Sequence, residues 1–116
     1  MKQKKAKIAA VKPNRYPSIL PVLQSISPDA VAEYKFHPIR RWKSDWAIPS
    51  AKILIEIEGA IFVAGRHSRG AGMIQDMCKY NTAATMGYFV LRFHPGDIRT
   101  GLLFKTVREV YEISKK

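Results

Sequence analysis

The sequence predicts an α/β protein with a central mixed β-sheet that contains a β-hairpin and is flanked by helices. The chain of 116 residues has the length of one domain, and its 47% hydrophobic content is sufficient for a core. Two strand-like stretches around a proline turn predict the hairpin. A strand, helix, strand succession follows and favours a mixed sheet with flanking helices.

The N-terminal end is strongly basic. The first fifteen residues contain six lysine or arginine side chains and no acidic one, which is typical of a solvated arm. We therefore divide the chain into a flexible basic arm over residues 1–15 and a single domain over residues 16–116. Prolines interrupt the stretch after the arm, so the first helix is expected to start at Ser27-Pro28-Asp29 and to carry Ala30–Tyr34. There serine can cap the helix, proline suits the first helical position, and aspartate favours the positive end of the dipole.

The centre of the chain predicts the β-hairpin. Its strands are Arg41–Ile48 and Lys52–Glu58, and Pro49-Ser50-Ala51 supplies the turn. Side chains along a strand alternate between the two faces of a sheet, so the three isoleucines of the second strand share one face. Glu56 and Glu58 therefore project together from the other face.

Three carboxylates are expected to meet on this polar face. With Ser50-Ala51 at the tip of the turn, Asp45 falls opposite Glu56, and their Cβ atoms are about 5 Å apart. Glu58 lies on the same face. Like charges this close repel, and a hard divalent cation, Mg²⁺ or Mn²⁺, would neutralise them. Carboxylates that hold such a metal in a basic protein suit phosphodiester chemistry.

A surface strand is the alternative interpretation of the same carboxylates. Its acidic side chains would then pair with Lys43, Lys52 or an arginine. Spacing alone does not decide between a metal centre and such ion pairs, because a Glu-x-Glu pattern is common in strands.

The second half of the chain predicts the remaining elements. A third strand is expected at Ala60–Val63, followed by a glycine-punctuated segment that lacks the spacing of a phosphate-binding loop. Apolar side chains at steps of three or four predict a helix over Ala71–Met86. Tyr88–Phe93 has the composition of a short buried strand, and Thr100–Ile113 that of a final amphipathic helix.

The charge balance indicates an anionic partner. The formal net charge is +11 and the pI is about 10.1, which favours nucleic acid, an anionic membrane or an acidic protein. No stretch has the length and apolar character of a membrane span or a signal peptide. The single cysteine, Cys78, excludes an internal disulfide, so we expect a cytoplasmic protein without a membrane partner.

An ordered series of motifs resembles the PD-(D/E)xK restriction-endonuclease-like superfamily, and within it the very-short-patch repair endonucleases and related small bacterial and phage nucleases. The resemblance covers about Glu33 to Phe93. The motifs are Asp45-Trp46-Ala47-Ile48-Pro49, the acidic strand that ends at Gly59, Gly65-Arg66-His67, Lys79-Tyr80-Asn81, and Gly87-Tyr88-Phe89-Val90-Leu91-Arg92-Phe93. It implies a restriction-endonuclease-like fold and a Mg²⁺-dependent endodeoxyribonuclease in DNA repair, recombination or phage DNA processing.

The resemblance also implies roles for individual residues. Asp45 matches the metal-binding aspartate of the superfamily, Glu56 matches its second carboxylate, and Glu33 matches an accessory acidic residue of some members. The chain departs from the pattern at Glu58, where lysine is usual. Glu58 would then complete the metal shell or accept the proton of the attacking water, and Lys79 on the following helix is the candidate for a migrated lysine.

Two residues of the glycine-punctuated segment, Arg66 and His67, remain alternatives to Lys79 as the source of the missing positive charge. An imidazole titrates near neutral pH, so His67 is a candidate general acid or base, and a structural histidine is the competing interpretation.

The expected DNA contacts are basic side chains that bind backbone phosphates. They are the arm, Arg40, Arg41, Lys43, Arg66 and Arg69. Trp42 and Trp46 are either wedges between bases or ordinary core residues. A homodimer that cuts both strands and a monomer that nicks are both compatible with this size.

Two other classes of function stay open. The first is a catalytically inactive nucleic-acid-binding module of the same fold, which the glutamate at position 58 favours. The second is a small basic protein whose acidic strand binds a protein partner. Metal-dependent nicking of DNA separates the nuclease from both, and salt-dependent DNA binding separates the two from each other.

Deletion of residues 1–12 is expected to weaken the binding of any DNA duplex and to flatten its salt dependence. Each phosphate contact that is lost reduces the number of counterions that the DNA releases on binding. The measurement is the slope of log affinity against log salt concentration for the full chain and the truncated chain. An unchanged slope would assign the arm no role in binding.

Overall fold

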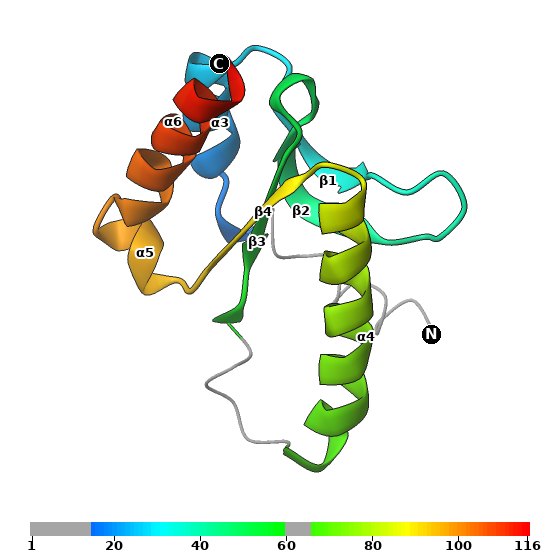
Figure 1. The fold of residues 1–116 in the computed structure, drawn as a ribbon. Coiled ribbons are helices and arrows are strands. Elements are labelled where there is room, and N and C mark those ends of the chain that lie inside the picture. Colours follow the sequence, from blue (N-terminus) through cyan, green and yellow to red (C-terminus); the bar gives the residue numbers. More distant parts are fainter. Residues whose placement is uncertain (1–14, 60–65) are drawn as a thin grey trace, which may run out of the picture.

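A computed structural model describes residues 15–59 and 66–116 (Figure 1). Its centre is a four-stranded sheet in the order β1-β2-β3-β4. The strands are β1 Val31–Lys35, β2 Lys43–Ile48, β3 Ile53–Ile57 and β4 Phe89–Phe93. The first three strands are antiparallel, and β4 is parallel to β3. The prediction of an α/β fold with a mixed sheet and a hairpin is confirmed.

Helices cover both faces of the sheet. They are α3 Ile19–Ile26, α4 Arg66–Thr85, α5 Gly96–Arg99 and α6 Leu102–Ser114, and the hairpin turn is a short 3-10 helix, η1, over Pro49–Ala51. Figure 1 shows α3 and α6 together on one side of the sheet and α4 on the other. No helix within residues 15–59 and 66–116 combines the length and the apolar character needed to cross a bilayer.

The larger core lies between the sheet and the pair formed by α3 and α6. Its buried side chains include Ile19, Leu23, Trp46, Ile48, Ile53, Ile55, Ile57, Leu103 and Val107. The three isoleucines of β3 share this face, as the period-two pattern predicts. The face toward α4 has a smaller apolar cluster around Phe36, Ala47, Leu54 and Ala83. Glu56 and Glu58 lie on this second face, where they contact Lys79 and Tyr80 of α4.

The hairpin has the predicted register. Ile48 pairs with Ile53, and Trp46 pairs with Ile55. Lys52 ends η1 in the left-handed conformation with a φ of 57°, and its N–H donates to the Pro49 carbonyl at 3.0 Å. Continuation of this register by one residue places Asp45 opposite Glu56.

The prediction for the first helix is wrong. The helix is α3, which ends before Ser27, and the expected helix Ala30–Tyr34 is replaced by strand β1. Pro21 does not break α3 because it lies in the first turn, where backbone N–H groups have no intrahelical acceptor.

Ser27-Pro28-Asp29 is a turn between α3 and β1, and Asp29 ties it to η1. The Asp29 carboxylate accepts hydrogen bonds from the Ser50 N–H at 2.8 Å and from the Ser50 hydroxyl at 3.0 Å. Burial raises the pKa of Asp29, but hydrogen bonds from Ser27 and Ser50 outweigh it, and the net pKa lies below its ordinary value. The residues that suggested a helix cap therefore bind another segment instead.

The second half of the chain also differs from expectation at α4, β4 and α5. Helix α4 begins at Arg66 rather than at Ala71. Strand β4 is an edge strand in which only Phe93 is buried, and Phe89 is 37% exposed. The expected strand Ala60–Val63 lies outside the described residues, and a short helix, α5, precedes the final helix.

Helix α4 extends beyond the sheet. It has 20 residues, and its Lys79, Tyr80 and Ala83 lie against the sheet. Closer to its N-terminus, Met73 and Ile74 are exposed. Figure 1 shows this part of the helix projecting below the body of the protein.

Truncation of Ile55 to alanine is expected to lower the free energy of unfolding by about 2–5 kcal/mol, because the side chain is fully buried in the larger core. Urea unfolding measures the loss. Leu102→Ala is the matched control, since Leu102 is 45% exposed. Equal effects of the two substitutions would contradict the assignment of Ile55 to the core.

Candidate active site

A row of acidic residues crosses three strands of the sheet. The pairs Ala32 with Trp46 and Tyr34 with Ser44 place Glu33 of β1 beside Asp45 of β2. The register of the hairpin places Asp45 beside Glu56 of β3. We call Glu33, Asp45 and Glu56 the acidic row. The paired residues of β2 and β3 end at Trp46 and Ile55, so the expected placement of Asp45 opposite Glu56 follows from continuing this register by one residue.

Glu33 was expected at the end of a helix. It belongs instead to strand β1. Its backbone has a φ of 52°, a left-handed conformation that is uncommon for a residue other than glycine. Its carboxylate lies 3.6 Å from the Lys43 ammonium, and both side chains are partly exposed. An exposed pair of this kind contributes little to stability.

Asp45 and its neighbour Ser44 connect β2 to β3 through their side chains. The Ser44 hydroxyl is buried, accepts a hydrogen bond from the Ile55 N–H at 3.1 Å and donates to the Trp46 carbonyl at 2.6 Å. The Asp45 Oδ2 accepts a hydrogen bond from the Ile57 N–H at 2.9 Å. These bonds orient the Asp45 carboxylate toward the C-terminal end of β3.

Glu56 forms a buried ion pair with Lys79 of α4. The Lys79 Nζ lies 3.0 Å from the Glu56 Oε2, and the two side chains are 14% and 5% exposed. The ammonium also donates to the Lys43 carbonyl at 2.7 Å. A buried carboxylate is costly without a partner, and Lys79 supplies both charge and hydrogen bonds. One lysine thus contacts both strands of the hairpin.

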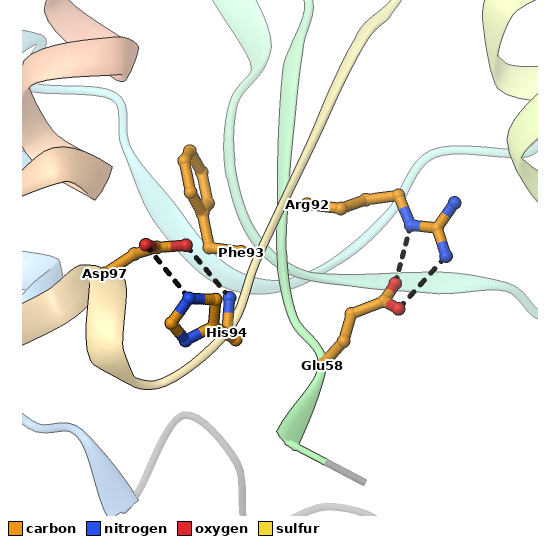
Figure 2. A pocket seen from close by; sticks show the side chains of 5 residues that line it. All are labelled: Glu58, Arg92, Phe93, His94 and Asp97. Carbon is orange, nitrogen blue, oxygen red and sulfur yellow. Dashed lines mark hydrogen bonds and ion pairs between the residues drawn. The ribbon is translucent and has the colours of Figure 1, made fainter. Parts of the chain in front are cut away.

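Glu58 is bound by two residues that sequence reasoning did not assign to the site. Arg92 of β4 forms a forked pair with it, Nε to Oε2 at 2.7 Å and Nη2 to Oε1 at 3.0 Å (Figure 2). The Tyr80 hydroxyl donates to the same carboxylate at 3.2 Å, and the Arg92 guanidinium lies 4.5 Å from the Tyr80 ring. The available signal for Arg92 was its position as the single charge in an apolar strand.

The two partners of Glu58 stay protonated at ordinary pH. Burial, followed by the charges of Glu56 and Glu58, raises the pKa of Tyr80. The hydrogen bond to Glu58 is the main reason that the pKa of Arg92 is raised. Tyr80 is therefore a hydrogen-bond donor here and not a base.

A pocket of about 300 Å³ adjoins this group and is lined by Glu58, Arg92, Phe93, His94 and Asp97. Figure 2 shows that the His94 ring is turned toward Asp97. Its Nδ1 accepts a hydrogen bond from the Gly96 N–H at 3.0 Å, and its Nε2 lies 3.3 Å from the Asp97 carboxylate. Both ring nitrogens thus contact residues of the turn after β4.

The basic residues expected to bind DNA lie in two places. Arg40 and Arg41 are in the exposed loop that connects β1 to β2, and Lys43 begins β2. The structure places the backbones of Arg66, His67 and Arg69 in the first turns of α4 instead of in a loop, and their side chains are outside the described part of the chain. The basic arm up to residue 14 is also outside it.

Asp45 and Glu56 are the two members of the acidic row that could hold a Mg²⁺ ion. Mg²⁺ binds proteins through one or two carboxylates and keeps its other positions for water and phosphate. Asp45 and Glu56 are adjacent in the row, whereas Glu58 is engaged by Arg92 and Tyr80. Within residues 15–59 and 66–116, no group of three or more acidic, histidine or cysteine side chains has the geometry of a metal site.

The carboxylates have protein counter-ions in this structure. Lys79 pairs with Glu56, Arg92 with Glu58, and Lys43 with Glu33. Repulsion between the acidic side chains therefore does not by itself require a metal. Lys52, the other lysine considered as a partner, lies instead over the Tyr88 ring at 4.2 Å.

Comparison with known proteins adds no assignment. No family model, curated protein or solved structure matches the chain. The site geometry and the charge of the chain are therefore the observations from which a function is proposed.

Lys79→Met is expected to lower the free energy of unfolding by about 3–5 kcal/mol, because it removes the ammonium that is paired with the buried Glu56 carboxylate. The double substitution Lys79→Met with Glu56→Leu should recover most of this loss. Urea unfolding of the three variants and the wild type, arranged as a double-mutant cycle, measures the coupling.

The pH dependence provides a second readout of the same pair. A buried carboxylate that has lost a cationic partner is costly in its charged form only, so protonation at acidic pH relieves part of the cost. The deficit of Lys79→Met should therefore be smaller at acidic pH than at neutral pH. A pH-independent deficit, or purely additive substitutions, would contradict a buried ion pair.

Proposed function

We propose that the protein is a metal-dependent DNA endonuclease that hydrolyses phosphodiester bonds. The observation that supports this most is the position of Lys79, whose ammonium lies 3.0 Å from Glu56, the neighbour of Asp45 in the acidic row. Two carboxylates and a lysine thus come together from β2, β3 and α4. The net charge of +11 provides the attraction for a polyanionic substrate.

In this proposal each residue has a defined task. Asp45 and Glu56 hold the metal, which when bound polarises the scissile phosphate and activates a water molecule. Lys79 stabilises the negative charge that develops on the phosphate, because its ammonium is already oriented by Glu56 and by the Lys43 carbonyl. Glu33 is an accessory acidic residue at the β1 end of the row.

Lys79 is also the residue that best accounts for the glutamate at position 58. The superfamily pattern usually has a lysine there, and in this chain Glu58 is bound by Arg92 and Tyr80. A lysine that reaches the second carboxylate from α4 supplies the missing charge from another element. We accordingly assign Glu58 a supporting role, while Arg66 and His67 remain the alternatives to Lys79.

The DNA-binding surface is proposed to adjoin this site. The Lys43 carbonyl contacts Lys79 at the site, and Arg40 and Arg41 lie in the loop that directly precedes Lys43. A restriction-endonuclease-like fold and a role in DNA repair, recombination or phage DNA processing belong to this proposal, as does action in the cytoplasm as a monomer or homodimer.

A catalytically inactive nucleic-acid-binding module is the second candidate. The ion pairs of Glu56 with Lys79 and of Glu58 with Arg92 favour it, because they satisfy both carboxylates within the protein. Such a module would bind DNA through the same basic residues and would not cleave it with any divalent metal.

Asp45→Asn is expected to abolish Mg²⁺-dependent or Mn²⁺-dependent nicking of plasmid DNA and to leave DNA affinity nearly unchanged, because it removes a metal ligand and no cation. Circular dichroism checks that the variant is folded, since Asp45 also binds the β3 backbone. Glu109→Gln, an exposed carboxylate paired with Lys105 on α6, is the matched control. Wild-type nicking by Asp45→Asn would exclude the proposed site, and DNA binding without cleavage by the wild type would support the inactive module.

A further inference from the structure

We propose that the loop between β1 and β2 is a wedge that inserts Ile39 between base pairs of duplex DNA while its arginines bind the adjacent phosphates. This inference rests on the proposed DNA substrate, but not on cleavage. The loop comprises residues 36–42, between Lys35 and Lys43 at the ends of the two strands. Figure 1 shows it extending away from the sheet and from α3 and α6.

Ile39 has the exposure expected of an inserting side chain. It is 85% exposed, more than any other large hydrophobic residue among those described. An apolar side chain in water gains free energy when a base stack removes its surface from solvent. Isoleucine is among the residues that architectural proteins insert at base steps.

The loop holds Ile39 at its tip in a defined conformation. The His37 Nδ1 accepts hydrogen bonds from the Ile39 N–H at 3.1 Å and from the Arg40 N–H at 2.9 Å. At the base of the loop, Phe36 is buried and stacks on Trp42, with ring centroids 6.2 Å apart. The loop is therefore built before DNA arrives, and insertion requires little further ordering of the backbone.

The charges around Ile39 identify a polyanion as the occupant. Residues 35–43 contain four basic side chains and no acidic one, and all four of these residues are exposed. They are Lys35, Arg40, Arg41 and Lys43. The Arg40 guanidinium lies 4.5 Å from the centre of the Trp42 ring, which orients it beside the tip. A single isoleucine among four cations is too small an apolar surface for a protein partner and suits DNA phosphates on both sides of a base step.

The loop also lies next to the candidate active site. The Lys43 carbonyl at its end accepts the hydrogen bond from Lys79, the lysine paired with Glu56. DNA that is held and unstacked by the loop is thus positioned with its backbone near the acidic row. The two tryptophans are not the wedge, because Trp46 is only 1% exposed and Trp42 is packed against Phe36.

The experiment measures unstacking with a short duplex that carries several 2-aminopurine–thymine pairs, whose fluorescence rises when the bases unstack. Titrations in EDTA avoid cleavage. The wild type should raise the fluorescence on binding, and Ile39→Ser should bind with affinity reduced by less than about tenfold but without the rise, since phosphate contacts supply most of the affinity. Ile113→Ser, on α6 and 55% exposed, is the matched control and should behave as the wild type.

Arg41→Gln provides the complementary result. It should keep the fluorescence rise at saturation and lower the magnitude of the salt slope of binding by about 1, as expected for one lost phosphate contact. A fluorescence rise that persists in Ile39→Ser, or bound wild type without any rise, would overturn the wedge. Variants of the loop that leave DNA binding and fluorescence unchanged would indicate a surface for a protein partner, and would overturn it too.

The result for the wedge can be separated from the result for the nuclease. Unstacking that depends on Ile39, without cleavage in Mg²⁺ or Mn²⁺, would overturn the nuclease proposal alone. Cleavage without unstacking would overturn the wedge alone. A wild type that does not bind duplex DNA at all would overturn both.

Discussion

The ion pair between Lys79 and Glu56 is the interaction on which the arrangement of this protein depends most. Glu56 lies in β3, a strand that is buried along its whole length, and the desolvation of its carboxylate costs several kcal/mol, on the order expected for a buried ion. Lys79 of α4 brings a cation to it at 3.0 Å. The apolar cluster between α4 and the sheet is small, so this polar contact defines how the helix lies on the sheet. The same ammonium also donates to the carbonyl of Lys43, the residue at which β2 begins.

The hairpin could be predicted from sequence because its signals are local and agree with one another. A turn with proline joins strands whose isoleucines alternate, and a shift by one residue would expose all of them, so the register that places Asp45 opposite Glu56 has no close competitor. The first helix could not be predicted in the same way. Ser27 and Asp29 are good cap residues, but their side chains form a turn that binds Ser50, a residue distant in sequence. Tertiary contacts decided between two uses of the same residues.

The carboxylates of the site could be predicted from the sequence. Of the residues that neutralise them, only some could be predicted. Lys79 was found by analogy with a lysine that a family pattern requires. Arg92 and Tyr80 lie in motifs of the resemblance that gave them no role, and their approach to Glu58 depends on the parallel pairing of β4 with β3 and on the path of α4. Parallel pairing joins segments separated by a helix, and spacing along the chain does not report it. The structure thus supplies the charges opposite the acids, whereas the spacing alone did not decide between ion pairs and a metal.

The projection of α4 beyond the sheet has a mechanical consequence. The helix is about 30 Å long at 1.5 Å per residue, and the contacts described for it lie near its C-terminal end. The helix is therefore held on the sheet close to Lys79, and the exposed side chains of Met73, Ile74 and Met77 lie N-terminal to this contact. A partner bound to this projecting part would act on the same continuous helix that carries Lys79, the residue paired with Glu56.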